Sequence, residues 1–348
     1  MSSLLAASER AHGANVIALL MKPQGKPYAD QLLHGVRRRN DFPHRSPEAS
    51  MSRGPPRVSW VDLLLTAIAP IVWGSTYLVT TELLPADRPL LAAVMRALPA
   101  GLLLVALGGR LPRGAWWWRM AVLGVLNIGA FFYLLFVAAY HLPGGVAALI
   151  LSSQPVIVLI LGTLLLGRAF VPVQLLACVL AVAGVGLVAL QPGARFDGVG
   201  IAAGGAGALS MALGLVLSKR WGRPSGVGVM TYTGWQLGIG GAVLLPVMLL
   251  GEGLPAGLSA ANWMGFGYLS VIGALLAYAL WFRGIERMPA LSLSFLSLLS
   301  PLSAALLGFV YLGQGLGPTQ LLGAACVVGA VVLAQARDAA TAASDPSS

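Results

Sequence analysis

The sequence predicts an all-α integral membrane protein in which ten helices cross the bilayer. Of its 348 residues, 57% are hydrophobic and only 10% are charged, whereas an average soluble domain has about 25% charged residues. Long apolar runs recur after residue 57, and Lys and Arg residues gather between alternate runs. A soluble protein with so little charge could not cover its surface, and a disordered chain is far less hydrophobic. Two cysteines cannot form a disulfide framework.

The segment before the apolar runs, residues 1–57, is polar and basic, and we expect a disordered cytoplasmic tail. Its one apolar stretch, residues 16–21, is too short to span a bilayer and has no cleavage-site pattern. Met51 opens a compact basic lead into the first run, so a second interpretation is that translation starts there and residues 1–50 are not translated. Residues 337–348 are expected to form a disordered C-terminal tail.

Ten runs after the tail have the length that a membrane-spanning helix requires, about 20 residues. The run at 198–217 gives the weakest signal because it is rich in Gly and Ala, but its Leu and Val content suits a tightly packed span. The predicted helices cover residues 59–79, 89–108, 117–138, 144–166, 172–190, 198–217, 229–250, 263–281, 290–312 and 318–336.

Basic residues between the helices predict the orientation, because cytoplasmic loops carry an excess of Lys and Arg. With the N-terminus inside, the outer side holds only Arg88 and Arg195, whereas the inner side holds ten basic residues besides the tail: Arg110, Arg113, Arg119, Arg168, Lys219, Arg220, Arg223, Arg283, Arg287 and Arg337. We therefore expect a multi-pass protein of the inner (plasma) membrane with both termini in the cytoplasm. Because most basic residues flank apolar runs, the net charge of +10 does not indicate a nucleic-acid partner.

The chain contains an internal repeat that appears when it is shifted by 146 residues. Pro143, Pro155 and Pro172 then fall on Pro289, Pro301 and Pro318, and the earlier helices match more weakly at a shift near 140. The repeat divides the membrane part into residues 58–190 and 198–336, with five helices in each. Since five is odd, the second half enters the membrane from the opposite side. Inverted repeats are typical of secondary transporters, whose small-molecule substrate binds at the midplane between the halves and is released by alternating access.

Three stretches, APIVWGSTYLVTTELLP (69–85), RALPAGLLLVAL (96–107) and LNIGAFFYLLFVAAYHLPGGVAALI (126–150), resemble the EamA branch of the drug/metabolite transporter superfamily. Within it the closest resemblance is to PecM-type exporters, named for the blue pigment indigoidine. The resemblance covers residues 58–336 and implies two EamA repeats and export of a pigment or another small metabolite; an amino-acid-like metabolite is the alternative. The family usually has Glu after a Leu-Gly pair in both repeats, where this chain has Arg168 and Gln314.

Arg96 is the clearest candidate for a functional residue, because ionisable side chains within a membrane are costly. It lies about eight residues into the second helix, and Gln236 occupies the corresponding position of the second half. One interpretation is that Arg96 contacts an anion or carbonyl group of the substrate in a central cavity. The other is that Arg96 is structural and snorkels or binds the carbonyl groups of a broken helix.

Other polar and aromatic residues near mid-span extend this candidate pathway. Trp73, Ser75 and Thr76 either line the pathway or serve helix packing, which uses the same small residues. Further along the chain, Asn127 is another polar candidate for the pathway. Tyr133 and Tyr278 either offer aromatic faces to a planar substrate or anchor the helices at the membrane interface.

Two prolines at equivalent positions predict paired interruptions of the fourth and ninth helices. Gln154 precedes Pro155, and Ser297 and Ser300 precede Pro301. Each proline frees a carbonyl group one turn back, which can bind substrate or water. The polar side chains either line the cavity or repair the kinks, and the two prolines are candidate hinges.

Several residues near the helix ends are given structural roles. Asp62 and Glu82 are expected to be solvated, and Arg283 and Glu286 are expected to form a local ion pair because they lie three residues apart. Cys178 and Cys326 are expected to be packing residues. Glycines of the fifth and tenth helices (Gly184, Gly186, Gly323 and Gly329) suit either packing within the chain or a homodimer.

The sequence predicts no cofactor, metal or catalytic site. The four His residues have no metal-ligand spacing, and the single Gly-Lys pair lacks the rest of a P-loop. No acidic residue lies clearly at mid-membrane, so proton coupling is not evident. A membrane enzyme would need clustered His, Asp or Glu, and a channel would favour a selectivity ring built by oligomer symmetry. A secondary transporter is therefore the leading interpretation.

Overall fold

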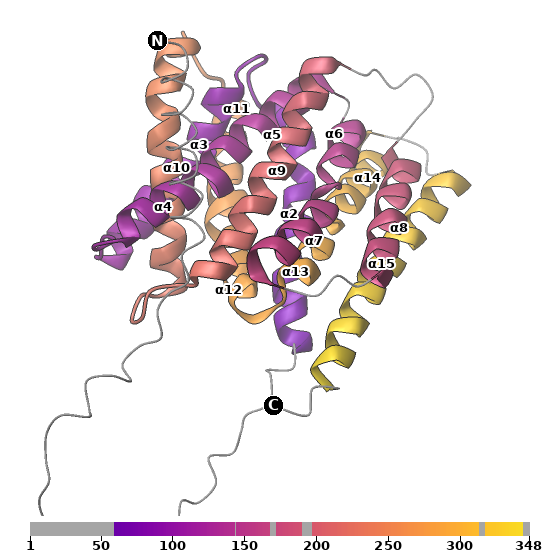
Figure 1. The fold of residues 1–348 in the computed structure, drawn as a ribbon. Helices are drawn as coiled ribbons and strands as arrows, with labels where there is room; N and C mark the ends of the chain where they lie inside the picture. The colour runs from indigo at the N-terminus through magenta and orange to yellow at the C-terminus, as the bar shows by residue number, and fades with distance from the viewer. Residues whose placement is uncertain (1–58, 143, 168–171, 190–196, 313–316, 344–348) are drawn as a thin grey trace, which may run out of the picture. The chain divides into compact units, whose positions relative to one another are not determined.

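A computed structural model describes residues 59–142, 144–167, 172–189, 197–312 and 317–343, in which every regular element is helical (Figure 1). The other residues include the predicted N-terminal tail with its alternative start, Met51, and the two positions at which the usual family Glu is replaced, Arg168 and Gln314. Predictions about these residues lie outside the described part of the chain.

The helices follow the order expected from the apolar runs. The first half contains α2 (Trp60–Leu83), α3 (Pro89–Gly108), α4 (Trp116–Gly124), η1 (Val125–Gly129), α5 (Ala130–His141), α6 (Gly144–Leu151), α7 (Gln154–Leu166) and α8 (Pro172–Ala189). The second contains α9 (Gly198–Trp221), α10 (Val229–Gly251), α11 (Ala260–Ser270), η2 (Val271–Leu276), α12 (Ala277–Arg287), α13 (Ala290–Leu296), α14 (Leu299–Leu312) and α15 (Pro318–Ala343). The last helix thus continues beyond its predicted end at residue 336.

Eight helical segments of the described chain are long and apolar enough to cross a membrane. The apolar stretches of α8 and α15, residues 172–188 and 318–334, are shorter. These two helices are the predicted fifth and tenth spans, and their length alone does not establish that ten helices cross the membrane. The prediction of an all-helical membrane protein is confirmed by the eight long apolar segments and by the helical character of every described element.

A π-helical turn interrupts the third helical segment of each half at equivalent positions, since η1 begins at residue 125 and η2 at residue 271, 146 residues later. After η1, the Ala130 amide bonds to Val125 O, five residues back. After η2, the Ala277 amide bonds to Ile272 O and Ala274 O. An α-helix would instead use the carbonyl four residues back. The carbonyl groups of Leu126 and Gly273 are therefore available to other partners.

A second interruption occurs at the two repeat-related prolines. Residues 152–153 separate α6 from α7, and residues 297–298 separate α13 from α14. Each break lies just before its proline, Pro155 or Pro301, which has no amide hydrogen to continue the helical ladder. The structure thus places a helix break where the sequence suggested a hinge.

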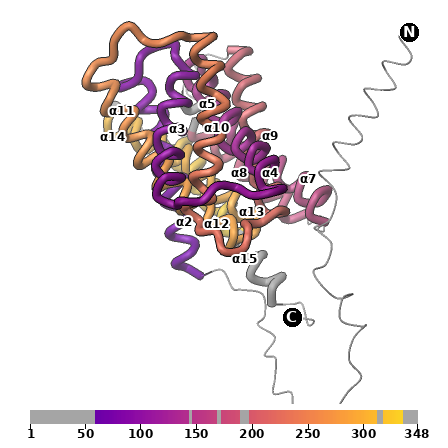
Figure 2. Tube along the Cα trace, turned by 90° about the vertical axis from the view of Figure 1, so that its left-hand side faces the viewer, coloured from indigo at the N-terminus to yellow at the C-terminus, as the bar shows by residue number. Residues whose placement is uncertain are grey.

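Equivalent helices of the two halves pack directly against each other. In Figures 1 and 2, α3 lies along α10, and α15 lies along α8. Glycines make these approaches close: a Cβ atom on Gly323 of α15 would lie 2.5 Å from Gly184 O, and one on Gly101 of α3 would lie 2.2 Å from Gly238 N. The glycines of α8 and α15 that suggested a dimer surface therefore include a pair, Gly184 and Gly323, that is used within the chain.

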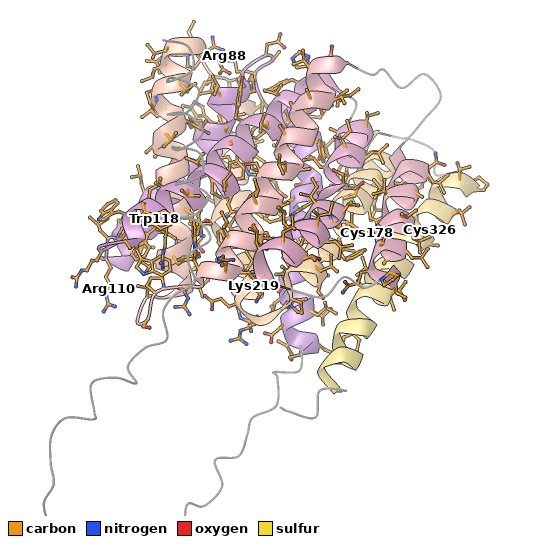
Figure 3. All side chains as sticks on the ribbon, in the orientation of Figure 1. Arg88, Arg110, Trp118, Cys178, Lys219 and Cys326 are labelled. Atoms are coloured by element: carbon orange, nitrogen blue, oxygen red, sulfur yellow. The ribbon has the colours of Figure 1, made fainter. Side chains whose placement is uncertain are left out.

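The two free cysteines lie on this same helix pair, Cys178 on α8 and Cys326 on α15 (Figure 3). Cys178 is buried, and Cys326 is partly buried.

Figure 3 shows Arg110 and Lys219 at one end of the bundle and Arg88 at the opposite end. Ion pairs join the start of α2 and the segment after α9 to the end of α12. Asp62 of α2 bonds to Arg283 of α12 at 2.6 Å and to Arg287 at 3.0 Å, and only 9% of Asp62 is exposed. Glu286 pairs with Arg223, not with Arg283. The predictions of a solvated Asp62 and of an Arg283–Glu286 pair are therefore wrong, because both residues of α12 find opposite charges on neighbouring segments.

At the Arg88 end, acidic side chains cap helices. The Glu252 carboxylate accepts hydrogen bonds from the amides of Leu90 (2.6 Å) and Leu91 (2.9 Å) at the start of α3. Asp197 caps α9 by accepting from the Gly200 amide at 2.9 Å. That hydrogen bond, with a smaller contribution from His141 at 3.2 Å, holds the pKa of the Asp197 carboxyl below its ordinary value. The Glu252 cap thus ties the end of α10 to the start of α3, and the Asp197 cap is local to the first turn of α9.

The close approach of α8 and α15 makes a testable prediction about stability. Gly323→Ala should destabilise the protein by about 1–3 kcal/mol, because the added methyl group would press on the Gly184 backbone. The matched control is Gly329→Ala on the same helix, where a Cβ atom meets nothing within 4 Å. Thermal unfolding in detergent measures both variants, and equal stability of the two would contradict the packing.

Candidate functional site

A cavity lies where helices of the two halves meet. It contains about 630 Å³ of space between atoms, open solvent included. Both halves contribute to its wall, which is formed by Trp73, Tyr77, Arg96, Phe131, Leu135, Ala148, Leu151, Ser152, Gln154, Ala208, Met211, Ser297, Leu298, Ser300 and Pro301. Six of the predicted candidates, the residues at positions 73, 96, 154, 297, 300 and 301, are thus brought to one site.

Arg96 contributes the positive charge of the cavity wall, and only 1% of the residue is exposed. Its Nη1 donates to Thr76 Oγ1 at 3.3 Å, and its Nη2 donates to Gly273 O, the carbonyl left available by η2, at 3.2 Å. The guanidinium also lies 4.5 Å from the centroid of the Phe132 ring. Its Nε has no partner among the described residues. Arg96 therefore binds a carbonyl of an interrupted helix, as the structural interpretation expects, and it also lines the cavity. Its contact with a substrate stays a prediction.

Aromatic side chains form one side of the cavity. The Trp73 indole nitrogen donates to Gly273 O at 3.0 Å, which fixes the orientation of the ring. The Trp73 ring lies 4.8 Å from the Tyr278 ring and 5.1 Å from the Trp281 ring, measured between centroids. Tyr278 does not line the cavity but packs behind Trp73 and Phe132. These contacts hold the Trp73 ring in place at the cavity wall.

The helix breaks contribute polar groups to the cavity. The Ser297 hydroxyl and the Gln154 carboxamide lie 3.3 Å apart, so the two breaks meet. Gln154 is 6% exposed, and its amide nitrogen has no partner among the described residues. Ser300 and Pro301 line the cavity beside them, whereas Pro155 does not.

Asn127 and Gln236 form a second polar cluster outside the cavity wall. The Asn127 side-chain nitrogen donates to Gln236 Oε1 at 2.8 Å and to Ser218 Oγ at 3.1 Å. Beside this cluster, the Ser210 hydroxyl donates to Leu126 O, the carbonyl left available by η1, at 2.8 Å. Side chains of the second half thus form hydrogen bonds with the π-turn of the first half. Arg96 and Trp73, which belong to the first half, likewise bond to the π-turn of the second half.

The remaining candidates do not line the cavity. Ser75 bonds to the Tyr268 hydroxyl at 2.8 Å, and Thr76 reaches the site only through Arg96. Tyr133 is partly buried and lies off the cavity wall, where α5 presents Phe131 instead. The π-turn before α5 adds one residue, which rotates every following side chain by about 100° relative to an uninterrupted helix.

Sequence reasoning also missed Tyr77 and Gly273. Tyr77 had a usable signal, because it lies one turn after Trp73 on the same helix face. Gly273 had no usable sequence signal except that it aligns with Asn127 at the shift of 146 residues. It contributes to the site through its backbone carbonyl, which any residue type would supply.

Comparison with known proteins gives consistent results. The EamA-like transporter family matches the chain twice, over residues 60–190 and 198–335. Protein PecM of Dickeya dadantii is 50% identical over 267 residues, which cover 77% of this chain and 90% of that protein. The uncharacterized inner membrane transporter YedA of Escherichia coli K12 is 31% identical over 273 residues, covering 76% of this chain and 87% of YedA. A solved crystal structure of another protein superposes on this chain with a TM-score of 0.65, over 79% of this chain and 97% of the other. The two sequences are 20% identical, so this match supports only a similar fold.

The polar cluster makes a prediction about coupling between the halves. Gln236→Leu should destabilise the protein by about 1–3 kcal/mol, because it removes the nearer of the two acceptors of the buried Asn127 amide, Gln236 Oε1, and leaves only Ser218 Oγ. Asn127→Leu combined with Gln236→Leu should cost less than the sum of the two single changes. Unfolding of the four proteins in detergent completes the cycle, and additive effects would contradict a direct interaction.

Proposed function

Because this chain belongs to the EamA-like transporter family, we propose that it exports small metabolites by alternating access between its two repeats. It is a multi-pass membrane transporter, and its proposed substrate site is the cavity between the halves. Residues 58–190 and 198–336 form the proposed repeats, with five spans in each. In this proposal both termini lie in the cytoplasm. The end of the bundle that carries Arg110 and Lys219 faces the same side, because basic residues favour the cytoplasmic side of a membrane.

The observation that carries the proposal is the composition of the cavity wall, to which both halves contribute interrupted helices. Broken helices that meet near the middle of a bundle are typical of inverted-repeat transporters. Gln154 and Ser297 lie at the contact between the two breaks. In this proposal Pro155 and Pro301 act as hinges, and movement at the two breaks exposes the cavity to one side of the membrane and then to the other.

The proposed substrates are planar metabolites, such as a heteroaromatic pigment. The faces of Trp73, Tyr77 and Phe131 suit a flat ring system, and the high identity to PecM supports a substrate related to that of this relative. An amino-acid-like metabolite is the alternative, which the guanidinium of Arg96 supports because it can bind a carboxylate. Among the described residues no group of His, Cys, Asp or Glu could hold a metal ion, so a metal-dependent enzymatic function has no support there.

Filling the cavity tests the proposed site. Ala208 lines the cavity, whereas Ala206 on the same helix is exposed on the outside of the bundle. Ala208→Phe should reduce efflux at least tenfold because the ring occupies the substrate space, and Ala206→Phe should leave efflux unchanged.

The measurement is efflux from cells preloaded with a panel of planar aromatic compounds and amino acids, compared with empty vector at matched membrane expression. The compound that the wild type exports identifies the substrate class. Equal effects of the two Phe variants would contradict the assignment of the cavity. No efflux of any compound by a well-expressed wild type would contradict export of these metabolites.

A further inference from the structure

We infer that the cavity selects substrates with an anionic group, a carboxylate bound at Arg96 and carried by a flat aromatic body that packs against Trp73 and Tyr77. This inference rests on the proposed transport function and narrows its substrate class. Its basis is a buried guanidinium that forms no ion pair with the described residues and that shares its cavity with the aromatic side chains of Trp73 and Tyr77.

The charge of Arg96 is not neutralised by the residues around it. Its contacts are a hydroxyl group, a backbone carbonyl and an aromatic face, contributed by Thr76, Gly273 and Phe132. Among the residues that the structure describes, no carboxylate lines the cavity. The described salt bridges are made by other residues near the helix ends. An unpaired cation within a membrane is costly, so a bound anion would stabilise this arrangement.

The second half of the chain serves as an internal control for the structural role of Arg96. Gln236 occupies the equivalent position and also bonds to the π-turn of the opposite half, through Asn127. A neutral carboxamide is therefore sufficient for a cross-half hydrogen bond at this place in the fold. The structural contact therefore does not require the positive charge of Arg96. Of the two equivalent residues, only the charged Arg96 lines the cavity, whereas Gln236 does not.

Two buried side-chain donors that have no partner among the described residues belong to residues of the cavity wall, and this inference assigns the anion to them. Arg96 uses Nη1 and Nη2 for the protein, whereas its Nε has no such partner. The unpartnered amide nitrogen of Gln154 lies on the same cavity wall. Guanidinium groups match the geometry of carboxylates. The absence of an acidic side chain from the wall disfavours an ammonium group, so aromatic acids fit this cavity better than amines.

Binding of matched acids and amides to the purified protein in detergent tests the inference. The probes are 2-naphthoate with 2-naphthamide, benzoate with benzamide, and cinnamate with cinnamamide, each measured by equilibrium dialysis. We expect the wild type to bind at least one acid about tenfold or more tightly than its amide. Arg96→Gln should abolish this preference, Arg96→Lys should retain part of it, and Arg88→Gln should leave it intact. Arg88 is the matched control because it bonds to the backbone of residues 252 and 253 outside the cavity.

The wild type alone can overturn the inference, so the result does not depend on whether Arg96→Gln folds. If no acid binds more tightly than its amide, or if the preference survives in Arg96→Gln, the inference is wrong. Dialysis measures binding without transport. Failure of export would therefore leave an acid preference standing, and export of neutral planar compounds without such a preference would overturn this inference alone.

Discussion

The carbonyl oxygen of Gly273 accepts hydrogen bonds from both Arg96 and Trp73, and much of the candidate site depends on this contact. In a bilayer a backbone carbonyl cannot turn to water, so a carbonyl released from the helical ladder has to find a partner within the protein. The π-turn η2 releases Gly273 O because the following amide bonds to Ile272 and Ala274. This requirement fixes the Trp73 ring and the guanidinium at the cavity wall.

The same constraint joins the two halves, because each half supplies the hydrogen bonds that the other lacks. Within η1, Ser210 satisfies Leu126 O and Gln236 bonds to Asn127. The two arrangements are related by the repeat but differ in charge, since Arg96 stands where the other half has Gln236. The charge difference between the two arrangements thus arises at one position of the repeat.

Sequence analysis could predict the elements that have a strong pattern. The apolar runs located the helices, and the shift of 146 residues located both proline breaks. The cost of placing a charged side chain within a membrane identified Arg96 as a candidate. It could not predict the π-turns, which have no distinctive residue type, and it therefore favoured Tyr133 where the structure presents Phe131. The Arg283–Glu286 pair failed for a related reason, because spacing along one helix does not reveal a better partner, Asp62, on another. Tertiary contacts decided both cases.

Alternating access is the central claim, and the accessibility of a cavity residue from each side of the membrane tests it most directly. Ser300→Cys, in a background of Cys178→Ser and Cys326→Ser, places a single thiol on the cavity wall. A membrane-impermeant thiol reagent should modify it in both right-side-out and inside-out vesicles. Leu254→Cys, which follows α10 and is 75% exposed, should react in right-side-out vesicles only. Modification of the Ser300→Cys thiol from one side alone would contradict alternating access.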